Sequence, residues 1–201
     1  KFLRNFPTLA DFSGLGKPVL VGTNRSEGKF QAAFTWLDPA KYAPPLLRRL
    51  TPERRSALLA HYPTLPDKAA FGELLTDVMY AFPKVRFAER LSRGGNPVYI
   101  YRFDYYTEAL EKMGLYACHV SELLPLFEFR TGPYQPLMAG SEEEVHTIGT
   151  RMRRYWGAFA RTGVPQVEGQ VEWKPYTEQA RHTLIIDRED RLELDPEEEI
   201  R

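Results

Sequence analysis

The 201-residue chain is long enough for one domain, and its 43% hydrophobic and 13% aromatic residues are sufficient to form a core. Its 27 Lys and Arg residues balance 27 Asp and Glu residues, so zero net charge gives no sign of a nucleic-acid partner. The single cysteine, Cys118, excludes an internal disulfide framework and a cysteine-rich zinc site, and it favours a reducing compartment such as the cytoplasm.

The first predicted elements are a strand and two helices. Residues 17–23, KPVLVGT, are apolar and β-branched and predict a buried strand in a parallel sheet. Apolar residues at helical spacing after Glu27 predict a helix that begins there. Residues 38–45, DPAKYAPP, are predicted to be irregular. Thr51 as N-cap and Pro52 at the first helical position then predict the second helix.

The middle of the chain predicts two helical segments and a strand. A stripe of apolar side chains predicts a helix over residues 67–81, which Pro83 is expected to interrupt. A second helical segment comes next and ends at the pair Gly94 and Gly95. Residues 97–105, PVYIYRFDY, are rich in aromatic and β-branched side chains and predict a strand.

The last part of the chain predicts two more helices and a hairpin. Ser121 is placed to cap a short helix of sequence ELLPLFEF. An apolar stripe predicts a long amphipathic helix over residues 142–161. The sequences HTLIID and RLELD flank a short polar turn and predict a terminal β-hairpin. The acidic ending DPEEEIR predicts a short solvated tail.

Strands separated by long helices predict an α/β fold. Only two interior strands and one hairpin are visible, which is few for an independent sheet that is buried on both faces. The chain also begins with Lys1 rather than Met. We therefore expect a piece of a longer protein, whose other segments complete the sheet.

Among the four histidines, His119 is the best candidate for chemistry. His61 is expected at a helix end, where an imidazole suits the helix dipole, and surface positions are expected for His146 and His182. His119 instead lies in a loop after a strand, and such loops carry the catalytic groups of α/β enzymes. A structural histidine bonded to the backbone is an equally simple interpretation.

Three groups could act together with His119. Cys118 is adjacent, but neighbouring side chains in an extended loop point in opposite directions, so a buried, inert thiol is the simpler interpretation. Glu122 could share a metal ion with His119, but no second cluster supplies further ligands, so we expect no metal and no other cofactor. Glu27 also lies just after a strand. If the two strands are parallel, Glu27 and His119 can meet at one sheet edge, where a carboxylate orients an imidazole for acyl transfer.

The order of these segments resembles the type-B carboxylesterase and cholinesterase family of α/β-hydrolases. GTNRSEG (22–28) is similar to the family's acid loop, and ACHVSELLPLFEF (117–129) is similar to its histidine loop. The resemblance implies that Glu27 is the acid and His119 the base of a Ser-His-Glu triad. LTDVMYAFPKVRFAERLSRGGNPVYIYRFDY resembles the helix and strand between the two loops. MRRYWGAFARTGVPQ and EWKPYTEQARHTLIID resemble the C-terminal helix and hairpin, so the likeness covers about residues 17–195.

The resemblance also implies further site residues. Glu122, one helical turn beyond His119, is expected to support the base from behind, with a helix-start carboxylate as the alternative. Phe30 and Phe34 resemble positions that line the family's aromatic pocket, with plain core packing as the alternative. Val120 stands where the family often has glycine, which is expected to alter the pocket wall without disabling the base.

Two motifs of the family do not occur in these 201 residues: the G-x-S-x-G nucleophile elbow and a glycine-rich oxyanion loop. In the family both precede the acid. The resemblance therefore implies that residues 1–201 are the C-terminal segment of a carboxylesterase α/β-hydrolase domain, incomplete without its N-terminal half. The acid loop near 27, the histidine loop near 119 and the helix and hairpin at 142–195 are its parts, and alone they are expected to be inactive.

The function that the resemblance implies is carboxylic-ester hydrolysis without a cofactor. The expected partners are a small-molecule ester and the N-terminal half of the same enzyme. No apolar stretch reaches the roughly 20 residues that cross a bilayer, so no membrane partner is expected. Two alternatives stay open. One is a non-catalytic, cholinesterase-like binding or adhesion module, and the other is a standalone domain that forms a homodimer through an exposed sheet edge.

Overall fold

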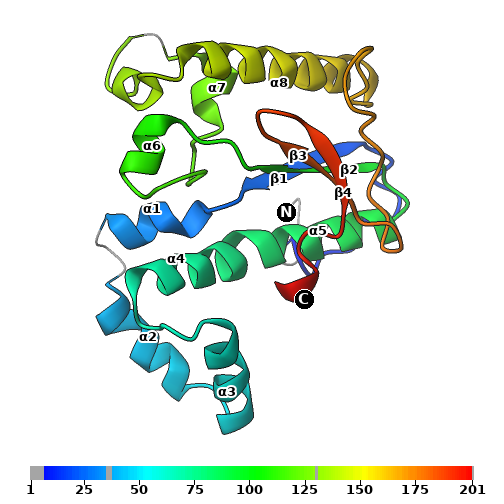
Figure 1. Ribbon diagram of the computed structural model, residues 1–201. Helices are drawn as coiled ribbons and strands as arrows, with labels where there is room; N and C mark the ends of the chain where they lie inside the picture. Colours follow the sequence, from blue (N-terminus) through cyan, green and yellow to red (C-terminus); the bar gives the residue numbers. More distant parts are fainter. Residues whose placement is uncertain (1–6, 35–37, 130, 201) are drawn as a thin grey trace.

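A computed structural model describes residues 7–34, 38–129 and 131–200 (Figure 1). Four strands form one sheet in the order β1-β2-β3-β4. They are β1 Val19–Asn24, β2 Val98–Phe103, β3 His182–Ile186 and β4 Arg191–Leu194. β1, β2 and β3 run parallel, and β4 pairs with β3 in an antiparallel hairpin. The predicted strands, their direction and the terminal hairpin are confirmed.

The register of β1 and β2 aligns their carboxyl ends. Val19 lies opposite Val98 and Asn24 lies opposite Phe103, so the loops after the two strands leave the sheet at the same edge. β1 is only half-buried over most of its length, not buried as predicted. The reason is that β1 has a neighbour on one side only among the described residues, at the edge of the sheet.

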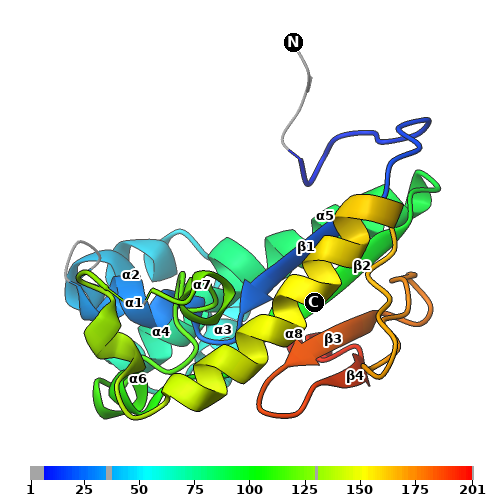
Figure 2. The same ribbon diagram turned by 90° about the horizontal axis from the view of Figure 1, so that it is seen from above.

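Eight α-helices are described. They are α1 Glu27–Ala33, α2 Pro39–Arg48, α3 Pro52–His61, α4 Lys68–Thr76, α5 Phe82–Arg93, α6 Glu108–Lys112, α7 Leu123–Phe127 and α8 Glu142–Thr162. A π-helix, Asp77–Ala81, joins α4 to α5, and 3₁₀ turns occupy Gln135–Met138 and Glu198–Ile200. α8 covers one face of the sheet and α5 the other (Figures 1 and 2).

The main core lies between α8 and the sheet. Met152 and Tyr155 of α8 are fully buried against Leu184 of β3 and Phe103 of β2. The indole of Trp173 completes this layer, and its Nε1–H donates to the Ile100 carbonyl at 3.1 Å. The amphipathic stripe that predicted the long helix therefore faces the sheet, as expected for a helix packed on one side.

Residues 38–45 form the start of α2, so the prediction of an irregular segment is wrong. Asp38 occupies the N-cap, and its carboxylate accepts a hydrogen bond from the Ala40 N–H at 3.0 Å. Pro39 takes the first helical position, where its missing N–H costs no helix bond. These two start signals outweigh Pro44 and Pro45, which lie inside the helix.

Pro83 does not interrupt the helix that precedes it. In the π-helix the turn widens, and the Phe82 N–H donates to the Asp77 carbonyl, five residues earlier. Pro83 then falls in the first turn of α5, where a proline is tolerated. α4 and α5 are therefore continuous through the π-helix instead of being two separated segments.

Ser121 does not cap α7 as predicted. The N-cap position belongs to Glu122, and no side chain caps this helix. The Ser121 hydroxyl is buried without a hydrogen-bond partner among the described residues. The cause is the turn that the backbone makes at Val120, which delays the start of the helix by one residue.

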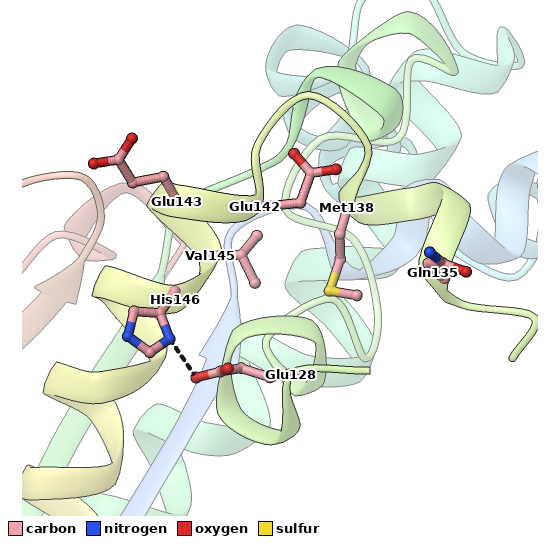
Figure 3. A pocket seen from close by; sticks show the side chains of 7 residues that line it. All are labelled: Glu128, Gln135, Met138, Glu142, Glu143, Val145 and His146. Carbon is pink, nitrogen blue, oxygen red and sulfur yellow. Dashed lines mark hydrogen bonds and ion pairs between the residues drawn. The ribbon is translucent and has the colours of Figure 1, made fainter. Parts of the chain in front are cut away.

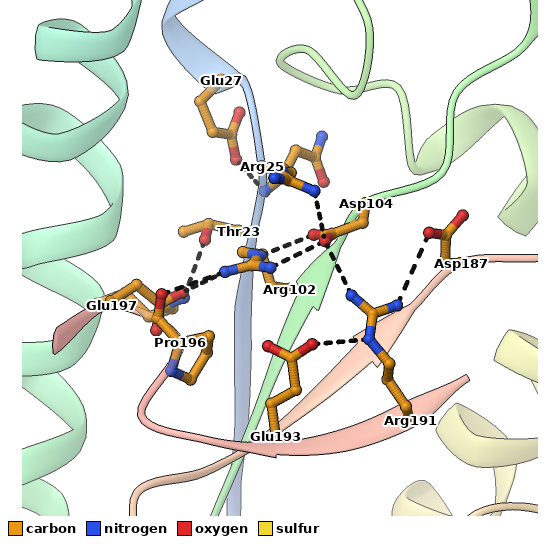
Figure 4. A network of polar contacts seen from close by, with 12 residues as sticks. Thr23, Arg25, Glu27, Arg102, Asp104, Asp187, Arg191, Glu193, Pro196 and Glu197 are labelled. Atoms are coloured by element: carbon orange, nitrogen blue, oxygen red, sulfur yellow. Dashed lines mark hydrogen bonds and ion pairs between the residues drawn. The ribbon is translucent and has the colours of Figure 1, made fainter. Parts of the chain in front are cut away.

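The acidic ending is not a fully solvated tail. Glu197 is buried, and its Oε1 lies 2.8 Å from the Nζ of Lys84, which is 4% exposed. Lys84 also donates to the Thr23 hydroxyl at 3.1 Å, so the tail is attached to the end of β1. Figure 4 shows Glu197 and Thr23 on this side of the polar network. A buried ammonium needs a counter-charge, and the carboxylate of Glu197 supplies it by being buried beside Lys84.

Candidate active site

The acid loop links β1 to α1 in two residues. The Arg25 N–H donates to the Phe103 carbonyl and the Ser26 N–H donates to the Ala117 carbonyl, both at 2.9 Å. The first bond fixes the loop to the end of β2, and the second fixes it to the histidine loop. Glu27 comes next as the first residue of α1 and is 6% exposed.

Gly28 shows why a glycine stands directly after this acid. Its N–H donates to the Thr76 hydroxyl at 2.9 Å, because α1 and α4 are in close contact here. A Cβ at position 28 would lie 2.2 Å from the Gly72 carbonyl oxygen. Only a residue without a side chain permits this approach, and the approach sets the position of Glu27.

The structure brings Glu27 and His119 into direct contact. His119 Nδ1 lies 2.8 Å from Glu27 Oε2, and Oε1 accepts the Asn24 backbone N–H at 2.8 Å. Burial raises the pKa of Glu27, and these two hydrogen bonds oppose that effect. A carboxylate only accepts, so Nδ1 carries the proton and Nε2 of the neutral ring presents a lone pair.

The imidazole of His119 is partly exposed, with 40% of its side chain accessible. The ring of Tyr80 packs against it at 5.2 Å between centroids. Gln31 holds Tyr80 in turn, with its Nε2 donating to the phenol oxygen at 2.5 Å. No hydrogen bond to Nε2 of His119 is found within the described part of the chain.

Asn24 is a site residue that our sequence reasoning missed. Its side chain donates to the Cys118 carbonyl at 2.7 Å and to a carboxylate oxygen of Glu122. Glu122, which was expected to support the base, contacts Asn24 and not the His119 ring. The position of Asn24, last in a strand and three residues before Glu27, was the available signal.

The three residues predicted to bind substrate line one apolar pocket together with His119. The pocket has a volume of about 380 Å³. The rings of Phe30 and Phe34 lie 4.8 Å apart on its wall, and Val120 adjoins His119. Its other lining residues are Leu110, Met113, Leu115, Cys118, Ser121, Leu123, Leu124, Phe129, Tyr134 and Leu137.

Cys118 is an inert thiol by its surroundings. It is 3% exposed, and burial raises the pKa of its thiol to about 12. The nucleophile in cysteine chemistry is the thiolate, which is scarce at neutral pH for such a group. The structure thus supports the interpretation of Cys118 as a small buried residue.

The other histidines lie away from this site. His61 ends α3, and His146 on α8 is exposed, with its Nδ1 3.1 Å from Glu128 Oε1 (Figure 3). His182 begins β3 and contacts the Pro175 carbonyl at 3.2 Å. The predicted positions of His61 and His146 are confirmed, whereas His182 is half-buried instead of lying on the surface. None of the three lines the pocket beside His119.

Val120 adopts a left-handed backbone conformation, with φ of 64°. A β-branched side chain is strained there, whereas glycine is not. We expect Val120→Gly to raise the free energy of unfolding by about 1 kcal/mol in urea titrations. Val164→Gly is the matched control, since Val164 is equally exposed and has no positive φ. Equal effects of the two changes would contradict strain at position 120.

Within the described ranges, no group of three or more His, Cys, Asp or Glu side chains could hold a metal ion. In the same part of the chain, no helix combines the length and apolarity needed to cross a membrane.

Comparison with known proteins identifies the family. The sequence profile of the carboxylesterase family matches residues 65–199. The chain belongs to the carboxylesterase family. A para-nitrobenzyl esterase of Bacillus subtilis (strain 168) is 32% identical over 203 residues, and carboxylesterase 1D of Rattus norvegicus is 26% identical over 204.

The carboxylesterase relatives are longer than this chain. The alignment with the Bacillus esterase covers 96% of this chain and 39% of the relative. A solved PNB esterase structure, 31% identical, superposes with a TM-score of 0.71 over 91% of this chain and 37% of its own. The α/β fold and the expected likeness to part of a carboxylesterase are therefore confirmed.

Proposed function

We propose that this chain supplies the acid and the base of a serine carboxylesterase. Glu27 is the acid and His119 the base of a Ser-His-Glu triad. The observation that supports this most directly is the contact of 2.8 Å between Glu27 Oε2 and His119 Nδ1. It is supported further by the apolar pocket that His119 shares with Phe30, Phe34 and Val120.

The proposed reaction is a two-step acyl transfer. His119 Nε2 takes the proton from a serine hydroxyl as the oxygen attacks the ester carbonyl, and it later gives that proton to the leaving alcohol. It then removes a proton from the water that attacks the acyl-enzyme and returns it to the serine oxygen as the bond to the acyl group breaks. Glu27 stabilises the imidazolium formed in each step and keeps Nδ1 protonated.

The nucleophilic serine is proposed to come from a further segment. These 201 residues contain no G-x-S-x-G, and they span only 39% of the Bacillus relative. Among the described residues β1 has a neighbour on one side only, and its other side is where a strand of that segment would pair. The substrate is proposed to be a small ester whose apolar part enters the pocket beside His119. A p-nitrobenzyl ester, which the name of the Bacillus relative indicates, is the first probe.

Hydrolysis of a p-nitrobenzyl ester tests this function. The chain alone should give background rates, and activity should require a nucleophile-bearing N-terminal segment of the same protein. In that complete form, we expect kcat/KM to fall about 10⁶-fold for His119→Ala and about 10⁴-fold for Glu27→Gln.

His182→Ala is the matched control, because His182 is a histidine away from the pocket, and it should leave the rate unchanged. Full activity of His119→Ala would overturn the proposal. A complete form that binds esters without hydrolysing them would instead favour the binding-module alternative, and hydrolysis by a dimer of this chain would favour the homodimer.

A further inference from the structure

Asn24 joins the acid loop to the histidine loop. It is the last residue of β1 and is 2% exposed. Its backbone N–H donates to Glu27 Oε1 at 2.8 Å. Its side-chain amide crosses to the other loop and donates to the Cys118 carbonyl, which belongs to the peptide group that precedes His119. One residue thus contacts the acid and the backbone next to the base.

The chemistry of the neighbours fixes the orientation of this amide. Both side-chain partners, the Cys118 carbonyl and the Glu122 carboxylate, are acceptors. Only the NH₂ end of an amide can face two acceptors, and its two hydrogens are both used there. An aspartate of the same size would place a third acceptor against these two and would repel them.

Asn24 also donates hydrogen bonds to two carboxylates. Glu27 and Glu122 are close enough for the charge of Glu122 to raise the pKa of Glu27, a smaller effect than that of burial. Asn24 donates to each of them, through its backbone N–H to Glu27 and through its side-chain amide to Glu122. Hydrogen bonds to a carboxylate favour its charged form, so Asn24 offsets the repulsion between the two acids.

We propose that Asn24 is a positioning residue that holds Glu27 and His119 at hydrogen-bond distance by fixing the acid loop to the histidine loop. This rests on the proposed roles of Glu27 and His119. Asn24 does not line the apolar pocket, so it acts on the pair and not on substrate binding. In the complete enzyme, loss of its side chain lowers kcat and leaves KM unchanged.

The proton on His119 Nδ1 gives a direct test with this chain. A proton shared between imidazole and carboxylate gives a separate low-field ¹H NMR signal, whose exchange with water reports how often the contact opens. In Asn24→Ala we expect this exchange to be about tenfold faster or the signal to be lost, because both side-chain hydrogen bonds that join the loops are removed, the one to the Cys118 carbonyl and the charge-assisted one to Glu122. Asn24→Thr, which keeps one donor, should give a smaller acceleration and covers the case in which Asn24→Ala does not fold.

Asn96→Ala is the matched control. Asn96 is also a buried asparagine, 5% exposed, whose amide donates to two backbone carbonyls, those of Phe12 and Leu91. It lies just before the amino end of β2, whereas Asn24 lies at the carboxyl end of β1, so the two residues are at opposite ends of these parallel strands. We expect this variant to lose thermal stability but to keep the low-field signal and its exchange rate.

The outcomes separate this proposal from the proposed function. A folded Asn24→Ala or Asn24→Thr chain whose signal exchanges as slowly as in the unchanged protein would overturn the role of Asn24 alone. An unchanged protein without any low-field signal would overturn the Glu27–His119 pair itself. A signal lost equally in the Asn24 and Asn96 variants would reduce Asn24 to a general structural residue.

Discussion

Gly28→Ala is expected to lower the free energy of unfolding by about 3 kcal/mol, the upper end of the usual range for an overpacked contact. The added Cβ would lie 2.2 Å from the Gly72 carbonyl oxygen and 2.6 Å from the Leu75 Cβ, so α1 must move away from α4. Glu27 precedes Gly28 on α1 and would move with the helix. The contact between Glu27 and His119 should therefore weaken as well. Urea unfolding monitored by circular dichroism measures the first effect.

Gly157→Ala provides the control for Gly28→Ala. Gly157 also lies within a helix, α8, but a Cβ there meets only the flexible end of Arg161 at 3.2 Å. Alanine is the better helix former by about 1 kcal/mol, so this variant should be as stable as the unchanged protein or more stable. If Gly28→Ala is equally stable, α1 and α4 are not in tight contact at position 28.

Glu197→Gln is expected to lower the free energy of unfolding by about 3 to 5 kcal/mol, because it leaves the Lys84 ammonium buried without its counter-charge. Burial lowers the pKa of Lys84, and Glu197 is the main group that opposes this. Between the lowered pKa of the folded chain and the unfolded value of 10.5, the unfolded chain therefore binds more protons at Lys84 than the folded one does. The variant should regain stability as the pH rises toward that value.

Two further variants define the ion pair between Lys84 and Glu197. Glu198→Gln removes an exposed neighbouring charge and should change the free energy of unfolding by less than about 0.5 kcal/mol. The double variant Lys84→Met with Glu197→Leu replaces both charges with apolar groups and should recover most of the loss. A Glu197→Gln chain as stable as Glu198→Gln would show that Glu197 is solvated, in line with the expectation from sequence.

The sequence was sufficient for those features that depend on local patterns. Apolar runs predicted β1 and β2, and the rule that parallel strands end at one edge predicted that Glu27 and His119 meet. Local start signals at Asp38 and Pro39 were present in the sequence, although residues 38–45 were predicted to be irregular. Such errors can be corrected from the sequence alone.

Other features depend on contacts between distant residues and leave no local pattern. Lys84 and Glu197 are 113 positions apart, and nothing in DPEEEIR distinguishes the buried carboxylate from its neighbours. Asn24 contacts Cys118 across 94 positions, and an asparagine after a strand is equally typical of an ordinary turn. Only the three-dimensional arrangement selects these residues.

The π-helix between α4 and α5 has a consequence for how one helix serves two cores. Each residue added to a helix rotates the remainder of that helix by about 100°, since a turn holds 3.6 residues. The wide turn at Asp77–Ala81 therefore shifts the helical phase, and the apolar stripe changes direction along the helix. Before the π-helix, Phe71 and Leu74 of α4 pack against α1 and α2. After it, Ala88 and Leu91 of α5 pack against the sheet. The π-helix thus marks the point along this continuous helix where its buried side chains pass from one core to the other.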